Sequence, residues 1–177
     1  MLMMRRTKKI AFAALAILFI LVVSFTVFAS TFRRPHRKTV LKYAASPALA
    51  FSVMKAESGF SESAVSEAGA VGLMQLMPST AQFVSERNQI EYRAERLYEG
   101  EYNAMLGCLY LNYLSSRFPD ESTMLAAYNA GEGTVSSWLK NAQYSDDGIR
   151  LKSIPYAETQ RYVKKVLNYR KIYAIFD

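Results

Sequence analysis

The chain has 177 residues, with 22 Lys plus Arg against 15 Asp plus Glu, one His and one Cys. This length allows one folded domain, and the single His and Cys exclude a His-rich metal site, a zinc knuckle and an intramolecular disulfide. Hydrophobic residues at 51% and charged residues at 21% are typical of a globular protein rather than a disordered one. We therefore expect neither a metal ion nor a cofactor in the domain.

The charge is unevenly distributed along the chain. Residues 1–42 carry nine basic groups and no acidic group, so the remaining 135 residues hold 13 basic and all 15 acidic groups, a net charge of −2. A domain without a basic excess has little to offer to phosphate backbones. The composition thus disfavours a protein that binds nucleic acid.

The amino-terminal segment contains an apolar run. Residues 10–29 read IAFAALAILFILVVSFTVFA, without a charge or a proline, and a helix of this length spans a hydrocarbon core of roughly 30 Å. We predict a basic segment at 1–9, a transmembrane helix at 10–29 and a basic linker at 30–45. A cleavable signal peptide is the alternative, because residues 27–29 fit a cleavage site. Basic residues flank the run on both sides, so charge does not fix its orientation.

From Ser46 onward the pattern is helical, with no convincing strand alternation. Ser46 and Pro47 supply an N-cap and a first-turn proline for a helix over residues 48–57. Apolar and aromatic residues at three- and four-residue spacing mark the longer helices that follow. Five further helices are predicted, at residues 78–86, 101–116, 122–130, 134–140 and 155–176. The sequence predicts one all-α domain at 46–177.

Glu57 ends the first of these helices, where the helix dipole disfavours a carboxylate by about 0.3–1 kcal/mol. A solvated Glu at a frayed helix end is the usual interpretation of such a residue. Two features argue against it here, a glycine-rich stretch after Glu57 and polar Gln75, Tyr128 and Asn129 set among apolar residues. His36 lies in the expected linker, so the predicted domain contains no histidine base and Ser-His-Asp chemistry is excluded. Cys108 lies in an apolar row, which favours a small buried side chain over a nucleophile.

Several short segments, in this order along the chain, resemble the soluble-lytic-transglycosylase-like family. This is glycoside hydrolase family 23, and goose-type lysozyme is a relative. The resemblance covers roughly residues 46–173, and it implies a lysozyme-like α fold that cleaves the MurNAc–GlcNAc β-1,4 bond of peptidoglycan. The segments are residues 57–60 (ESGF), 64–66 (AVS), 69–78 (GAVGLMQLMP), 127–131 (AYNAG) and 154–163 (IPYAETQRYV).

The resemblance implies a role for each matching residue. Glu57 matches the family's catalytic acid/base. Tyr156 and Gln160 depart from the pattern, because many members carry Phe and Arg there, and this affects substrate contacts rather than the acid. The residues that match substrate-binding positions of the cleft are Ser66, Gln75, Tyr128, Asn129, Glu158 and Tyr162.

A single catalytic carboxylate favours a reaction without water. The family resemblance predicts a lytic transglycosylase, and the apolar run predicts that it is anchored in the bacterial membrane with its domain on the wall side, or secreted if this segment is cleaved. Its partners would be glycan strands, and its product 1,6-anhydro-MurNAc. A hydrolytic muramidase is an alternative, with Glu158 as the base that activates water. A non-catalytic peptidoglycan-binding module of an envelope assembly is another, although an intact Glu57 argues against it.

Overall fold

The computed structural model describes the backbone of residues 2–176 and the side chains of residue 12 and residues 15–175. Within this range the regular structure is helical, and the only β pairing is two isolated bridges, Val65 to Val71 and Val71 to Leu76. The predicted all-α class is thereby confirmed. The chain divides into two compact units, Met1–Arg33 and Arg34–Asp177.

The first unit contains a single helix, α1 (Leu2–Thr31). Its described apolar side chains, among them Phe19, Leu21 and Phe25, are exposed. Over the residues with described side chains, no helix combines the length and hydrophobicity that a bilayer crossing requires. Residues 10, 11, 13 and 14 of the predicted transmembrane segment lie outside this set.

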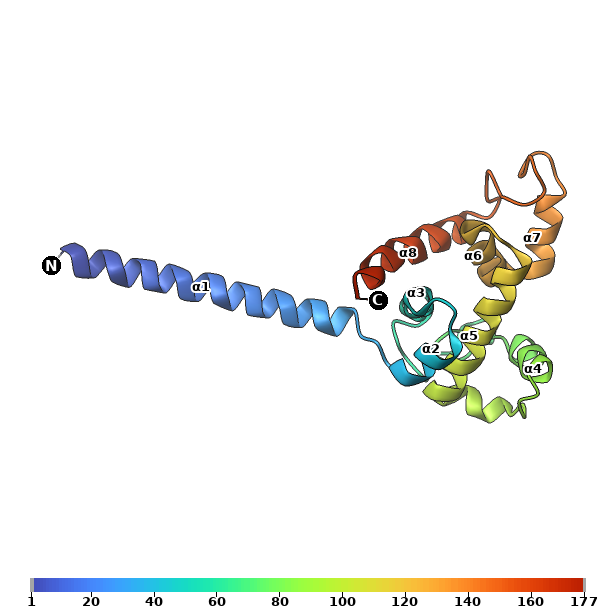
Figure 1. Cartoon of the computed structure of the whole chain (residues 1–177), viewed down its shortest axis with the longest axis horizontal. Helices are drawn as coiled ribbons and strands as arrows, with labels where there is room; N and C mark the ends of the chain where they lie inside the picture. Colours follow the sequence, from blue (N-terminus) through green and yellow to red (C-terminus); the bar gives the residue numbers. More distant parts are fainter. Residues whose placement is uncertain (1, 177) are drawn as a thin grey trace. The chain divides into compact units, whose positions relative to one another are not determined.

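The second unit is built around α3 (Pro47–Glu57). The helix starts as predicted, because Ser46 Oγ accepts a hydrogen bond from the Leu49 N–H at 3.4 Å and Pro47 occupies the first turn. Every residue from Ala48 to Met54 is buried, so α3 is enclosed on all sides. Helix α8 (Ala157–Tyr173) packs along it, and α5 (Gly100–Arg117) also contacts it (Figure 1). An enclosed helix of this kind brings its last residue, Glu57, to the interior of the domain.

Four of the remaining predicted helices lie within two residues of their expected bounds, and the last one, predicted to end at residue 176, ends as α8 at Tyr173. Helix α6 begins at an Asp120 cap, whose carboxylate accepts from the Thr123 N–H at 2.8 Å, and it ends at Gly131, whose φ is +93°. The predicted last helix starts later than expected, after Pro155. The helices other than α1, α3, α5 and α8 are α2 (Arg37–Tyr43), α4 (Pro78–Arg87), η1 (Ala94–Tyr98), α6 (Glu121–Ala130), α7 (Glu132–Leu139) and η2 (Ala174–Phe176).

The expected linker at 30–45 differs from the prediction, because it contains α2. This helix packs against α5, and its Val40 is fully buried. Asn112 of α5 donates to the Tyr43 carbonyl at 2.8 Å and accepts from the Ala45 N–H at 3.0 Å. The folded unit therefore begins before Ser46. A seven-residue helix with one buried side chain among basic residues leaves almost no periodic signal.

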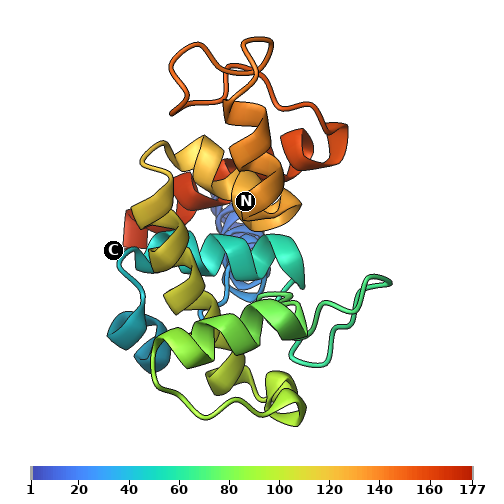
Figure 2. The same cartoon turned by 90° about the vertical axis from the view of Figure 1, so that its right-hand side faces the viewer.

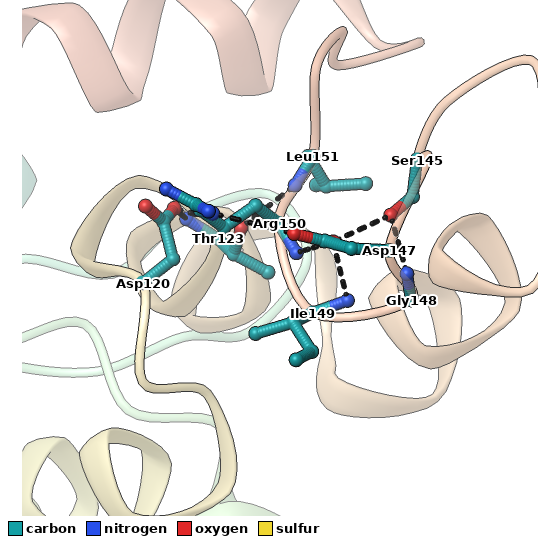
Figure 3. Close-up of polar contacts among 8 residues, drawn as sticks. All are labelled: Asp120, Thr123, Ser145, Asp147, Gly148, Ile149, Arg150 and Leu151. Carbon is teal, nitrogen blue, oxygen red and sulfur yellow. Dashed lines mark hydrogen bonds and ion pairs between the residues drawn. The ribbon is translucent and has the colours of Figure 1, made fainter.

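Polar contacts rather than apolar packing order the long connection from α7 to α8, shown in orange at the end of the domain in Figure 2. The Asp147 carboxylate accepts from the Ile149 and Arg150 N–H groups, both at 2.8 Å, and these bonds lower its pKa to about 2. Thr123 Oγ1 accepts from the Leu151 N–H at 3.0 Å and ties the connection to α6 (Figure 3). This hydrogen bond thereby holds the connection against α6.

Candidate active site

Glu57 is a partly buried carboxyl group at the carboxyl end of α3. Burial raises its pKa from 4.5 to about 7, and smaller opposing effects come from the Tyr162 hydroxyl and the Lys165 ammonium, both on α8. Near neutral pH the protonated and ionised forms are therefore similarly populated. A carboxyl in this state can donate a proton and take one back.

Lys165 was not expected in the site. Its Nζ donates a hydrogen bond to the Ala56 carbonyl at 2.7 Å. The last carbonyls of a helix lack partners within the helix, and a cation there also complements the helix dipole. Lys165 thus caps α3 directly beside Glu57. Its position three residues after Tyr162, on the same side of a helix, is the one signal that the sequence contains.

Two tyrosines, Tyr128 of α6 and Tyr162 of α8, approach Glu57. The Tyr162 hydroxyl is buried and lies near the Glu57 carboxyl without reaching hydrogen-bond geometry to any described group. The Tyr128 hydroxyl donates to the Met74 carbonyl at 2.7 Å. Burial, and then the charge of Glu57, raise the pKa of both tyrosines well above 10. Both hydroxyl groups therefore stay protonated and act as donors.

Asn103 of α5 fixes the backbone that carries Met74. This fully buried side chain accepts from the Met74 N–H and donates to the Val71 and Leu97 carbonyls, each at 2.9 Å. Gly72 has a φ of +78°, and a Cβ there would collide with the Asn103 amide. Only glycine fits this position, so the predicted glycine-rich stretch serves close packing around Asn103.

Ser66 and Gln75 hold the loop that follows α3. Ser66 Oγ accepts from the Ala70 N–H at 3.0 Å. The Gln75 amide donates to the Ala64 carbonyl at 3.1 Å and the Gly72 carbonyl at 2.9 Å. These bonds lie within the loop, so both side chains shape the backbone there. Gln75 also faces a pocket, whereas the described contacts of Ser66 are confined to the loop.

The pocket next to Tyr128 has a volume of about 240 Å³. Asn129 lies on its wall, and its Oδ1 accepts a hydrogen bond from the Thr159 hydroxyl at 2.7 Å, which orients the amide. Three predicted site residues, Gln75, Tyr128 and Asn129, therefore meet here. The complete lining is Gln75, Leu76, Met77, Thr80, Tyr110, Tyr128, Asn129, Ala130 and Gly131.

Glu158 is placed differently from its predicted neighbours. It is exposed in the first turn of α8, whereas Thr159 and Tyr162 are on the buried face of that helix. Its position four residues before Tyr162 on α8 therefore does not bring Glu158 into the interior. A larger cavity of about 700 Å³ is lined by other parts of α8, including Lys164 and Leu167, and shares none of the residues named in this section.

Comparison with known proteins identifies the family. Residues 34–150 match the Transglycosylase SLT domain model, so the chain belongs to this family, as its motifs predicted. The soluble lytic murein transglycosylase of Salmonella typhimurium is 38% identical over 135 residues, which cover 74% of this chain and 21% of that relative. The membrane-bound lytic murein transglycosylase C of Actinobacillus pleuropneumoniae is 31% identical over 160 residues, 77% of this chain and 44% of that relative.

A solved structure supports the same fold. The lytic transglycosylase Slt of Pseudomonas aeruginosa, crystallised as an inactive glutamate-to-glutamine mutant, superposes with a TM-score of 0.71 and 36% identity. The match covers 80% of this chain and 24% of that one. The chain thus spans less than half the length of these three proteins. The family model ends at residue 150, so the positions of Tyr162 and Lys165 beside Glu57 rest on the geometry of α8.

Proposed function

We propose that this chain is a peptidoglycan lytic transglycosylase that cleaves the MurNAc–GlcNAc β-1,4 bond without water. The observation that carries the proposal is Glu57, a carboxyl with a pKa of about 7 whose charge acts on Tyr128, one of the residues that line the polar, aromatic pocket. The names of the relatives support the activity, and the Pseudomonas neighbour is inactive as a glutamate-to-glutamine mutant. Among the described residues that line the pocket beside Tyr128, none is Asp or Glu.

One carboxyl group suffices if the substrate supplies its own nucleophile. Protonated Glu57 donates its proton to the glycosidic oxygen, and the N-acetyl group of MurNAc stabilises the positive charge at C1. Ionised Glu57 then removes the proton of the C6 hydroxyl, which attacks C1 and closes the 1,6-anhydro ring. Because the nucleophile and the electrophile belong to one sugar ring, proximity replaces a positioned water.

The surrounding residues take positioning roles in this proposal. Tyr162 offers an uncommitted hydroxyl to Glu57, and Lys165 holds the end of α3 while favouring the ionised form of the acid. We assign sugar contacts to Gln75, Tyr128 and Asn129, which line the pocket. Ser66 shapes the loop, and Glu158 is assigned to the rim, where it is exposed.

The products of digestion test the reaction. Purified sacculi digested by the protein should release muropeptides that resist borohydride reduction and that are lighter by one water than lysozyme products. In heavy-oxygen water the muramyl C1 should stay unlabelled, because no water enters the bond-breaking step. Mass spectrometry measures both properties in one digest.

Two other results would each establish a different function. Label at C1 in most of the product would mean that water is activated and that the protein is a muramidase, with Glu158 as the first carboxylate to examine. Intact sacculi that retain bound protein would indicate a binding module without catalysis.

We also propose that residues 10–29 keep the domain attached to the membrane on the side of the wall. Support comes from the uncharged run, from the exposed apolar side chains of α1, and from a relative that is membrane-bound. The mature protein should then fractionate with membranes and keep its original amino terminus. Amino-terminal sequencing that begins at Ser30 would instead establish a cleaved, secreted enzyme.

A further inference from the structure

The basic residues that precede the active-site helices belong in part to a folded element. Five basic residues and no acidic residue lie between positions 33 and 42, where a linker was predicted. In the structure three of them, Arg37, Lys38 and Lys42, are residues of α2, which contains no acidic side chain. Neither this helix nor its charge takes part in the proposed reaction.

The two sides of α2 differ in exposure. Val40 is fully buried, and α2 packs against α5. Four other residues of the helix are exposed, and they follow the i, i+1, i+4, i+5 spacing that places residues on one side of an α-helix. Leu41 is among them and is 48% exposed, although it is a large apolar side chain. We call these four residues the basic face of α2: Arg37, Lys38, Leu41 and Lys42.

The positive charges of the basic face have no acidic partner. Within the part of the chain that the structure describes, no carboxylate forms an ion pair with any of its three basic side chains. The Lys42 ammonium lies over the Tyr43 ring, 4.8 Å from its centroid. The nearest ion pair along the chain belongs to His36, whose Nε2 lies 2.8 Å from Glu62 Oε1. The basic face therefore presents uncompensated positive charge to an external anion.

A cavity of about 380 Å³ adjoins the basic face and is lined by residues of α2, η1 and α5. Three basic and two acidic side chains line it, so its net charge is positive. Arg96 and Glu91 are each paired with a charged residue outside the lining, at 3.0 and 2.8 Å. The basic face thus adds two ammonium groups without an ion pair, against the Glu101 carboxylate. The charged lining residues are Lys38, Lys42, Arg96, Glu91 and Glu101.

The covalent connection limits how far α2 can lie from a membrane that contains residues 10–29. Thr31, the last residue of α1, and Arg37, the first residue of α2, are only six positions apart along the chain. A fully extended chain of this length reaches about 20 Å. Anionic phospholipids attract clusters of basic residues that follow a membrane-spanning segment so closely. An exposed apolar side chain among them can enter the boundary between headgroups and acyl chains.

We propose that the basic face of α2 binds the headgroups of anionic phospholipids. Its ammonium and guanidinium groups contact the phosphates, and Leu41 enters the interface. Because Asn112 of α5 bonds to the backbone at the end of α2, this contact fixes the orientation of the domain on the bilayer. The inference rests on the proposed membrane attachment and deepens it, since an apolar anchor alone selects neither a headgroup nor an orientation.

The test compares the full-length protein in two kinds of lipid nanodisc, one of phosphatidylcholine and one that also contains phosphatidylglycerol. Amide hydrogen exchange in residues 37–43 should be about tenfold slower in the anionic disc, because the helix must leave the lipid before it opens. The triple variant Arg37→Gln/Lys38→Gln/Lys42→Gln should show equal exchange in the two discs.

Two control variants separate the basic face from total charge and from folding. Lys140→Gln/Arg161→Gln/Lys164→Gln removes the same charge from exposed side chains elsewhere in the domain, and it should keep the difference between the discs. A second variant exchanges Lys and Arg for one another at the three basic positions of α2, and it should also keep the difference. A loss of the difference in either control would overturn the proposal.

The remaining outcomes distinguish lipid from free phosphate. Equal exchange of the wild-type helix in the two discs would overturn the proposal. So would an equal slowing by inorganic phosphate added to the phosphatidylcholine disc, because the ligand would then be a free anion.

Failure of the membrane attachment gives a different result. If the mature protein begins at Ser30, that natural chain is sedimented with vesicles of phosphatidylglycerol or of phosphatidylcholine. Binding to the anionic vesicles alone, weakened about 10²-fold in the triple variant of α2, would support the headgroup site, since each basic residue contributes about fivefold. Absence of binding to the anionic vesicles would overturn it.

Discussion

Replacing Glu57 by Gln lowers peptidoglycan turnover by about 10²–10⁴-fold, the contribution of general acid–base assistance. The amide keeps the size of the side chain and loses both the proton to donate and the basic oxygen that takes one back. Release of soluble muropeptides from purified sacculi measures the effect. Glu158→Gln is the matched control, and it should lower turnover less, because Glu158 is exposed and does not line the pocket beside Tyr128. A loss below tenfold for Glu57→Gln would contradict its assignment as the acid.

The same substitution should raise stability above neutral pH. The folded-state pKa of Glu57 is about 7 against an ordinary 4.5, so the folded protein binds this proton more tightly than the unfolded chain does. The wild-type free energy of unfolding therefore declines as pH rises from 4.5 to 7 and levels off above it. The decline amounts to roughly 3 kcal/mol from this group. Denaturant unfolding of Glu57→Gln and wild type across this range should diverge, with the variant more stable at pH 8.

Replacing Asn103 by Ala should destabilise the fold by about 3 kcal/mol or more, because three buried backbone groups lose their partners at once. The substitution also removes the hydrogen bond to the Met74 N–H and so frees this residue, whose carbonyl accepts a hydrogen bond from the Tyr128 hydroxyl. Variants that still fold should consequently show a lower kcat. Urea unfolding followed by circular dichroism measures the stability, and the digestion of sacculi measures the activity.

Asn112→Ala is the matched control for this prediction. Asn112 also makes two hydrogen bonds to backbone, but in a partly exposed setting where water can replace it. Asn112→Ala should lower the free energy of unfolding by about 1 kcal/mol. If the two variants lowered the free energy of unfolding equally, the buried hydrogen bonds of Asn103 would not hold the backbone around Met74 in the way described.

The features predictable from the sequence are those with a local physical cause. A serine cap and a first-turn proline define the start of α3, and a glycine with positive φ defines the end of α6. Glu57 stood out because a glycine-rich stretch and isolated polar residues follow it in the sequence. The pocket residues Gln75, Tyr128 and Asn129 followed from their motifs, and the structure places them together.

Features that depend on tertiary contacts could not be predicted in this way. Lys165 is one of several basic residues on α8, and only the docking of α8 on α3 distinguishes it from Lys164. The buried face of α8 passes through Thr159 rather than Glu158, a shift of one residue that helical spacing alone does not resolve. Phe83 resembles an ordinary core residue in the sequence, and its exposure beside Glu132 becomes visible only in the fold.

The cap that Lys165 places on α3 also sets an order of assembly. Ala56 and Lys165 are separated by 109 positions, so the environment of the acid is completed by a contact of very long range. Such contacts form slowly, and a growing chain folds from its amino-terminal parts first. A nascent or truncated chain without α8 would have an acid with neither Tyr162 nor Lys165 beside it. The environment of Glu57 would thus be complete only when α8 docks, after the other α-helices of the domain have already been synthesised.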